Sequence, residues 1–453
     1  MDLITFNTPG LGDNTYVVAH EGTAVVIDPQ RDFGRFLTVT DGLGATVRMV
    51  FETHLHNDYV SGGLALAGAA GADLVLPAGA GAAFRFRPAF HHEDIDVGGL
   101  TVRPLHTPGH TPEHVSYLVL IEDEPVGLFS GGSLLVGAAG RTDLLGMDKA
   151  DSLAMLQFGS IQRLATLPAE VGLYPTHGPG SFCSVSAVGG PTSTIGTERA
   201  TNPLLAISDA ETFAANQLSG LQPYPSYYRH IGPINSRGSG PIPAGPVRSL
   251  DPSQVAALMD DEVAVVDGRP RAAVARARIP TAWAIELGSS FATWVGWLLP
   301  FDQRLVLVLD DESELDEART ALGRIGFTRI EGVMSGMDGW VAEGRPVVSH
   351  PTVTAGELVA AAVDPSQVLD VRAPNEWDDG HVEGSIHRHL PDLVGSIPDD
   401  LDPDLPVYVG CSGGQRAAVA AAVLADAGYR PVAIESGIAA LLHPAQHPTE
   451  AAG

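Results

Sequence analysis

The residues best suited to chemistry lie at Thr53 to Tyr59, where two histidines and an aspartate alternate. The apolar run Val47 to Phe51 predicts a buried strand, and His54, His56 and Asp58 follow it. Because alternate side chains of an extended segment share a face, the two imidazoles and the carboxylate can meet at one point. This ligand mixture favours a transition metal such as zinc or iron over calcium or magnesium.

Two further histidines follow apolar runs and lie in turns rich in glycine and proline. His110 lies within Thr107 to Thr111, and His177 lies within Thr176 to Gly180. Loops at strand ends commonly carry functional residues. The alternative explanation of the first motif is that its two histidines merely end a strand. Because two further histidines lie in such turns, a metal site is the better interpretation.

Together these motifs resemble the metallo-β-lactamase superfamily. Gly140 to Leu144 and His177 to Cys183 resemble, within it, the persulfide dioxygenase and glyoxalase II branch. The resemblance implies an αββα sandwich, two sheets with outer helices. The alternation of short apolar strands with glycine-rich turns in residues 1–222 fits the same arrangement.

One long helix is predicted within this region, from Asp151 to Leu167. Asp151 or Ser152 can cap its N-terminus, and its leucine, isoleucine and phenylalanine residues give it a broad apolar side. We expect this helix to have a structural role.

Two positions depart from the pattern of the two-metal hydrolases in this superfamily. Tyr59 stands where such enzymes usually have a second histidine, and Gly132 stands where they have a ligand aspartate. A hydrolase that needs both ions is therefore disfavoured. This weakens the alternative of a glyoxalase II-like thioester hydrolase more than it weakens the dioxygenase.

The resemblance to persulfide dioxygenases implies one iron, held by the first motif histidine, the Gly-His histidine and the aspartate. His54 and His110 carry over as expected ligands, and we hypothesise that His56 or Asp58 supplies the third, because Gly132 has no side chain. The expected cofactor is one Fe(II) per chain, with zinc as the alternative. A degenerate, empty site is the competing hypothesis.

The second half of the chain contains an internal repeat. Val263 to Arg269 is echoed by Val368 to Arg372, and Asp267 and Asp370 lie 103 positions apart (370 minus 267). The order of strands and helices in each copy predicts a parallel sheet covered by helices. The Asp-x-Arg pattern, together with Gly380 to Ile386, resembles the rhodanese family.

The chemistry that this second resemblance implies lies in one loop of the second copy. The strand Val407 to Val409 leads to Cys411, and Arg416 follows Gly413 and Gly414 at the start of an alanine-rich helix. A cysteine between a strand and a helix N-terminus has its thiolate favoured by backbone N–H groups and the helix dipole. Cys411 and Arg416 are the expected catalytic residues, and the two glycines are expected to bind substrate.

The first copy has no cysteine at the corresponding place. Its strand Leu305 to Leu309 leads into the acidic loop Asp310 to Glu314, which would repel an anionic persulfide or thiosulfate. We expect it to be an inactive spacer or docking domain.

Length and composition predict the domain organisation. A chain of 453 residues, of which 44% are hydrophobic, is expected to form about three α/β domains. The predicted ranges are a metallo-β-lactamase-like domain at 1–222, a linker rich in proline and glycine at 223–246, a cysteine-free rhodanese-like domain at 247–348 and a Cys411-bearing one at 352–444.

Charge and cysteine content limit the partners and the compartment. The formal net charge of −28 argues against nucleic acid and anionic membranes as partners. No apolar run approaches the roughly 18 residues of a membrane span. Two cysteines and no visible leader favour the reducing cytoplasm. Assembly into a homo-oligomer stays open.

The sequence thus predicts an enzyme of sulfur metabolism. The first domain would oxidise a low-molecular-weight thiol persulfide with dioxygen to sulfite. Cys411 would move sulfane sulfur between that persulfide, sulfite and thiosulfate. The alternatives are a thioester hydrolase, a sulfurtransferase with a degenerate metal site, and a non-catalytic sulfur carrier or sensor.

Overall fold

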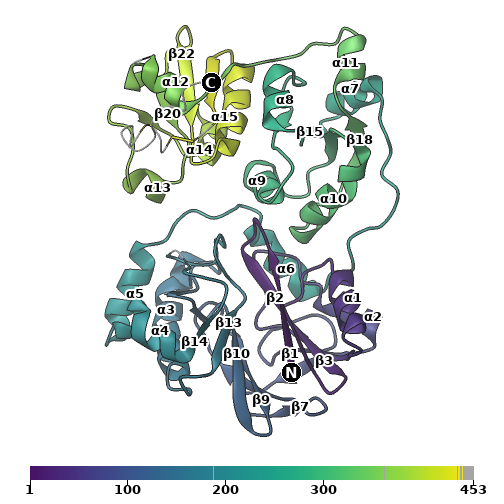
Figure 1. Ribbon diagram of the computed structural model, residues 1–453, viewed down its shortest axis with the longest axis vertical. Coiled ribbons are helices and arrows are strands. Elements are labelled where there is room, and N and C mark those ends of the chain that lie inside the picture. Colours follow the sequence, from purple (N-terminus) through teal and green to yellow (C-terminus); the bar gives the residue numbers. More distant parts are fainter. Residues whose placement is uncertain (187, 362, 436, 439–440, 442–453) are drawn as a thin grey trace, which may run out of the picture. The chain divides into compact units, whose positions relative to one another are not determined.

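The computed structural model describes residues 1–186, 188–361, 363–435, 437, 438 and 441. The chain forms two compact units, Met1–Pro243 with Thr320–Gly326, and Ala244–Arg319 with Phe327–Gly453 (Figure 1). The four domain ranges expected from the sequence stay a prediction, and the expected end at residue 444 lies outside the described residues. None of the helices in the described ranges is long and apolar enough to cross a membrane.

Two six-stranded sheets form the first unit. The first sheet contains, in spatial order, β1 (Asp2–Thr8), β2 (Asp13–His20), β3 (Thr23–Ile27), β4 (Thr46–Phe51), β5 (Asp73–Pro77) and β6 (Arg87–Ala89). The second contains β14 (Ser193–Thr194), β13 (Gly172–Pro175), β10 (Glu124–Gly131), β9 (Val115–Ile121), β8 (Thr101–His106) and β7 (Ile95–Asp96). A short hairpin, β11 (Leu134–Leu135) and β12 (Ala138–Ala139), follows β10.

The two sheets pack face to face, and helices cover both outer faces. Aromatic side chains such as Phe51 and Tyr117, with ring centroids 4.9 Å apart, fill the space between the sheets. The first sheet is covered by α1 (Gly34–Gly42) and α2 (Gly63–Ala70). The second is covered by α3 (Met147–Leu164), α4 (Ile195–Thr201) and α5 (Ala210–Ser219). The predicted αββα sandwich is confirmed.

The start of α3 differs from the prediction. The helix begins at Met147, after Gly146 with φ of 111°, so Asp151 and Ser152 lie inside it and do not cap it. The positive φ of Gly146 turns the chain into the helix earlier than the expected cap. The Asp148 carboxylate in the first turn then complements the helix dipole.

The segment expected as a linker, residues 223–246, contains a helix that belongs to the first unit. This helix, α6 (Tyr228–Arg237), places Asn235 against the metal-ligand motif. The Asn235 amide donates to the backbone carbonyls of His56 and Tyr59, both at 2.9 Å, and its oxygen accepts from the backbone N–H of Ser61 at 2.9 Å. The helix therefore holds the backbone of the predicted motif.

The second unit contains two parallel sheets with the same order of central strands. The first is β16 (Trp283–Ala284), β15 (Ala264–Asp267), β17 (Leu305–Leu309) and β18 (Ile330–Ser335). The second is β21 (Ile386–His387), β20 (Val368–Asp370), β22 (Pro406–Gly410) and β23 (Arg430–Ile434), with β19 (Thr352–Val353) added at the edge. The predicted parallel sheets are confirmed in both copies.

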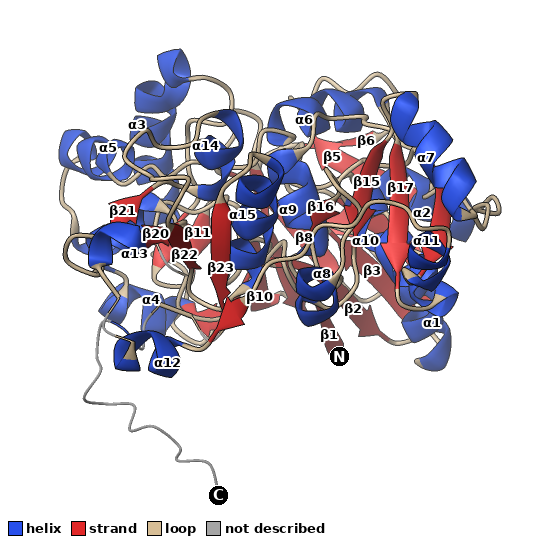
Figure 2. Cartoon of the chain, turned by 90° about the horizontal axis from the view of Figure 1, so that it is seen from above, coloured by secondary structure: helices blue, strands red, loops and turns tan. Residues whose placement is uncertain are grey.

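Helices accompany each of these sheets. Those of the first copy are α7 (Pro252–Asp260), α8 (Arg271–Arg276), α9 (Phe291–Leu298), α10 (Leu315–Arg324) and α11 (Asp338–Ala342). Those of the second are α12 (Ala355–Ala360), α13 (Pro374–Asp378), α14 (Leu390–Gly395) and α15 (Gln415–Asp426). Figure 2 shows α15 beside β22 and β23, against which it packs.

The Asp-x-Arg repeat is also a repeat of contacts. Asp267 and Asp370 are fully buried, and each accepts from both Nε and Nη2 of the arginine two residues later. In each copy that arginine also donates, at 2.7 Å, to the carbonyl ten residues after the aspartate, at Ala277 and Gly380. The same buried ion pair therefore fastens the same loop in both copies.

One buried arginine joins the two copies. Arg278, between α8 and β16, is 1% exposed. Its Nη2 donates to the Ala422 carbonyl at 3.2 Å and to the Asp426 carboxylate at 2.8 Å, both on α15. Its Nη1 donates to the carbonyls of Ile279 and Ala282 in its own copy. The end of α15 is thus fixed to the first copy.

The repeated ion pair generates a stability prediction. Asp370→Ala leaves the Arg372 guanidinium buried without its partner, which costs about 3–5 kcal/mol in comparable cases. We therefore expect a clearly lower urea midpoint for unfolding of the second unit. Asp302→Asn is the control, because it removes the charge of an exposed pair with Arg329 (60% and 47% exposed side chains), tolerates the φ of 64° at this position and should leave the midpoint unchanged. Equal midpoints for both variants would contradict the prediction.

Candidate metal centre and cysteine loop

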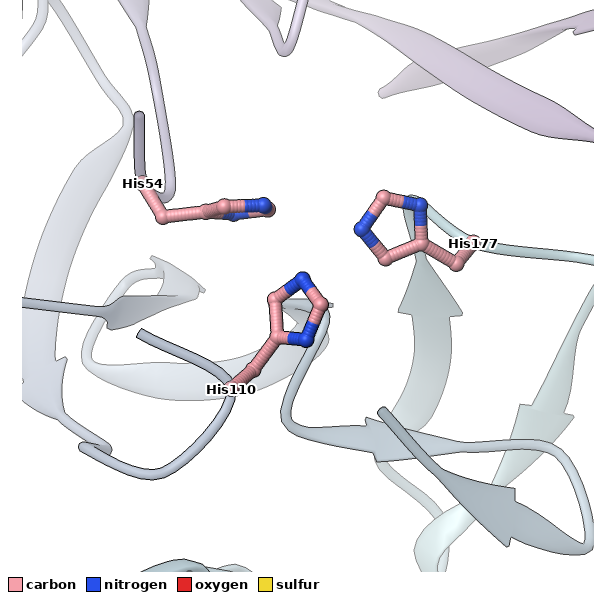
Figure 3. Close-up of side chains that lie close together, drawn as sticks. All are labelled: His54, His110 and His177. Atoms are coloured by element: carbon pink, nitrogen blue, oxygen red, sulfur yellow. The ribbon is translucent and has the colours of Figure 1, made fainter. Parts of the chain in front are cut away.

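Three histidines from separate loops converge in the first unit. His54 follows β4, His110 lies between β8 and β9, and His177 follows β13, so the loops come from both sheets. Each histidine has a ring nitrogen that lies within 4.8 Å of a ring nitrogen of the other two (Figure 3). All three Nε2 atoms are buried and have no hydrogen-bond partner among the described residues. Buried, unpaired nitrogens that face each other fit a metal ion.

Hydrogen bonds at Nδ1 fix two of these rings. The Nδ1 atom of His110 lies 2.7 Å from the Arg141 carbonyl, and that of His177 lies 3.0 Å from the Asp13 carboxylate. A carbonyl oxygen only accepts, so His110 carries its proton on Nδ1 and its Nε2 presents a lone pair. Histidine ligands of metals are commonly oriented by such partners.

The third ring is fixed through a threonine and a buried carboxylate. The Thr53 hydroxyl donates to Asp28 at 2.7 Å and lies 2.9 Å from Nδ1 of His54, from which it accepts. Asp28 also accepts from the Thr53 backbone N–H at 2.7 Å and from the Thr176 hydroxyl. Asp28 therefore positions the residues that precede His54 and His177.

The electrostatic environment differs among the three histidines. Burial, with His56 and His110 nearby, holds the pKa of His54 well below its usual range, and burial with His177 lowers the pKa of His110 to about 3. These two rings are neutral, as metal ligation requires. Burial opposes protonation of His177 too, but Asp58 and Asp13 outweigh it and raise its pKa to about 9. A metal must displace that proton.

His56 and Asp58, the residues hypothesised to supply the third ligand, form a second group with His177. Nδ1 of His56 and Oδ1 of Asp58 lie 4.0 Å apart, and neither has a hydrogen-bond partner among the described residues. Nε2 of His56 lies 3.1 Å from Asp28 and 3.2 Å from Glu52. Burial disfavours its charge, but these carboxylates raise its pKa well above the usual range.

The ion pairs of His56 favour a protonated, positively charged imidazole with a structural role over a neutral imidazole that binds a metal. The structure therefore groups His54 and His110 with His177, and leaves His56 and Asp58 as the alternative ligands. Sequence reasoning noticed His177 without assigning it as a ligand, although its Thr-His-Gly turn after an apolar run was a usable signal. Asp13 and Asp28 gave no such signal, because each is an isolated acidic residue at one end of a strand.

The space of the missing aspartate is occupied by a ligand ring. A Cβ atom on Gly132 would lie 2.7 Å from Cγ and from Nε2 of His110, far inside contact distance. His114, which is not among the predicted ligands, is buried nearby. Its Nε2 accepts from the Gly132 N–H at 2.9 Å, and its ring centroid lies 5.0 Å from that of His54. The absence of a side chain at Gly132 is thus a packing requirement of His110.

Two further residues contact the first motif: Tyr59, which departs from the hydrolase pattern, and Cys183, at the end of the motif that begins with His177. The Tyr59 hydroxyl lies 3.0 Å from Nε2 of His56. The Cys183 thiol donates to Asp58 at 3.3 Å, and burial together with Asp58 raises the pKa of this thiol well above its usual range. Cys183 is therefore a protonated, buried hydrogen-bond donor.

The cysteine loop of the second unit joins β22 to α15. Cys411 is 1% exposed, and its Sγ accepts from the Gly414 N–H at 3.0 Å. Gly414 has φ of 86°, and a Cβ there would lie 3.2 Å from the Glu435 backbone carbon, so the turn requires glycine. Gly413 is exposed with open space around its Cα.

Arg416 lies in the same loop, but an acidic residue compensates its charge. Both of its terminal nitrogens donate to the Glu376 carboxylate, and Nη2 also donates to the Ser412 hydroxyl at 2.5 Å. Burial lowers and Glu376 raises the pKa of Arg416, and the net shift is upward. Arg416 therefore ties the loop to α13, and its guanidinium also interacts with the Cys411 side chain.

Comparison with known proteins identifies two regions. Residues 8–177 match the family model "Metallo-beta-lactamase superfamily", and residues 354–441 match "Rhodanese-like domain". A hydroxyacylglutathione hydrolase-like protein of Homo sapiens is 33% identical over 177 residues, 37% of this chain and 57% of that protein. The chain spans 48% to 64% of the length of the first curated relatives that it matches.

Two solved structures are also similar. A metallo-β-lactamase from Staphylococcus aureus subsp. aureus COL has a TM-score of 0.66 and 28% identity, and the match covers 74% of this chain and 99% of that one. ETHE1 from Myxococcus xanthus is 30% identical with a TM-score of 0.45, and the match covers 52% of this chain and 98% of that one.

The histidine geometry predicts a metal-binding phenotype. His177→Ala should lose bound metal as completely as His54→Ala, because each removes one of three converging nitrogens. Metal per chain, measured by plasma mass spectrometry after dialysis, gives the answer. His91→Ala, which removes an exposed histidine, is the control. Retention of a full metal equivalent by His177→Ala would favour His56 or Asp58 as the third ligand.

The packing of Gly132 predicts an unusual result for a restored aspartate. Gly132→Asp adds a carboxylate but pushes the His110 ring out of place, so metal affinity should fall at least tenfold, in line with a loss of about 1.4 kcal/mol or more of binding free energy. If Gly132→Asp bound as much metal as the unchanged protein, His110 would not be fixed as described.

Proposed function

We propose that the metallo-β-lactamase domain and the rhodanese-like domain of this chain act on the same sulfur substrate. In the first domain a low-molecular-weight thiol persulfide, one dioxygen and one water give the free thiol, sulfite and two protons. In the second, Cys411 carries sulfane sulfur. The observation that carries the proposal is that one chain holds both a histidine site suited to a single metal and a cysteine loop suited to a persulfide.

The residues of the first domain fit one metal ion. His54, His110 and His177 would hold it through Nε2, and imidazole ligands suit iron as well as zinc. Bound iron would supply the redox chemistry with dioxygen, and three protein ligands leave positions open for substrate. The Asp13 carboxylate and the Arg141 carbonyl keep the Nδ1 protons of two ligands in place.

The cysteine loop supports sulfur transfer without oxidation. The Cys411 thiolate attacks the outer sulfur of the thiol persulfide, the S–S bond breaks, and the thiol leaves with the proton. Sulfite then attacks the outer sulfur of the cysteine persulfide, which gives thiosulfate and restores the thiolate. The Gly414 N–H, which donates to Sγ, stabilises the negative charge in both steps.

A thioester hydrolase is the second candidate. The hydroxyacylglutathione hydrolase-like relative favours it, and so does the second group of His56, Asp58 and His177. Tyr59 and the occupied space beside Gly132 weigh against a two-metal centre. A sulfurtransferase with an inactive first domain and a non-catalytic sulfur carrier are the remaining alternatives.

Oxygen uptake tests the proposal. The full chain loaded with Fe(II) should consume dioxygen on addition of glutathione persulfide, and His110→Ala should lower this rate at least a hundredfold. Cys411→Ser should keep oxygen uptake but form no thiosulfate from added sulfite. The exposed-residue variant His91→Ala should match the unchanged protein in both assays.

The opposite outcomes separate the alternatives. Hydrolysis of a glutathione thioester by the zinc-loaded chain, without oxygen uptake in the iron-loaded chain, would establish the hydrolase. Thiosulfate formation that needs Cys411, again without oxygen uptake, would leave only the sulfurtransferase.

A further inference from the structure

The cysteine-free copy of the second unit contacts the loop that carries Cys411. Ser290, just before α9, donates through its hydroxyl to the side-chain oxygen of Gln415 at 2.7 Å. Gln415 is the first residue of α15 and follows Gly414, whose N–H donates to the Cys411 sulfur. A side chain of the cysteine-free copy therefore fixes the turn that presents this N–H.

A second contact lies at the start of α14. The ring of Trp297, on α9, meets the ring of His389 edge to face, with centroids 5.5 Å apart and planes at 83°. His389 is 6% exposed and precedes α14. His389 leads into α14, and α14 packs against α15, so this ring contact connects the cysteine-free copy to the helix that follows Cys411.

A third contact lies at the far end of the same helix. Arg278 of the cysteine-free copy donates to the Ala422 carbonyl and to the Asp426 carboxylate. The cysteine-free copy thus holds α15 at its first residue and again near its last. The position and orientation of α15 depend on these contacts, and so does the direction in which the Gly414 N–H points toward the Cys411 sulfur.

We propose that the cysteine-free copy is a positioning element of the sulfur-transfer site, with Ser290 and Trp297 as positioning residues for the Cys411 loop. They touch neither the sulfur nor a substrate, and they act through Gln415 and His389. The proposal rests on the sulfur-transfer half of the proposed function and is independent of the metal centre. It gives the copy a role beyond the spacer or docking domain expected from the sequence.

Alkylation of Cys411 tests this inference. The rate of reaction of Cys411 with iodoacetamide at pH 7 is measured in the full chain by mass spectrometry of the Cys411 peptide. Ser290→Ala should slow alkylation about fivefold, as expected for loss of one hydrogen bond that stabilises the loop. Ser290→Thr keeps the hydroxyl and should restore the rate. Ser253→Ala, in the exposed first turn of α7, should leave it unchanged.

Transfer kinetics give a second readout. With glutathione persulfide as donor and sulfite as acceptor, Ser290→Ala and Trp297→Ala should lower kcat and leave KM unchanged, because neither residue touches the donor. Gln415→Ala removes the other partner of the hydrogen bond, and the Ser290→Ala, Gln415→Ala double variant should be no slower than either single variant.

The inference is overturned if Ser290→Ala and Trp297→Ala alkylate at the unchanged rate, or if Ser290→Thr is as slow as Ser290→Ala. Strictly additive effects of the two partner variants would also overturn it. Alkylation needs neither metal nor dioxygen, so a failed dioxygenase proposal leaves this test intact, and a failed alkylation test leaves the dioxygenase proposal standing.

Discussion

The buried carboxylate of Asp28 is the contact on which the first unit's site depends. It receives the backbone N–H and hydroxyl of Thr53, the hydroxyl of Thr176 and an imidazole nitrogen of His56. A fully buried charge is costly unless several donors satisfy it. The fold therefore has to bring the ends of β4 and β13, one from each sheet, to the same carboxylate. That requirement closes the sandwich at the end where the histidines lie.

The ligand geometry follows from this closure. Thr53 links Asp28 to the ring of His54, and Thr176 precedes His177, so the same carboxylate fixes the chain at two of the three histidines. The ring of His177 itself is oriented by Asp13. The third, His110, is set by the Arg141 carbonyl and fits only because Gly132 has no side chain. Gly132 departs from the hydrolase pattern and first suggested a degenerate site. In the structure, its missing side chain leaves the space that the His110 ring fills. The cysteine loop is built differently, from one turn and contacts across two copies.

Local patterns predicted much of this architecture, and long-range contacts account for what was missed. The strand before His54, the loop histidine His110 and the Asp-x-Arg repeat each have a short-range signature, and the sandwich and both parallel sheets were predicted from them. His177 and Asp28 are 149 positions apart (177 minus 28), and only the folded sheets bring their neighbourhoods together. The contact of Ser290 with Gln415 is equally non-local, and no sequence pattern of serine and glutamine predicts it.

The most direct test of the account is X-ray absorption spectroscopy of the metal-loaded chain, because it reports the ligands themselves. The account predicts one metal per chain with three imidazole nitrogens and no carboxylate from the protein. A shell dominated by oxygen, or scattering from a second metal at the roughly 3.5–4 Å typical of two-metal sites, would contradict the convergence of His54, His110 and His177 on a single ion.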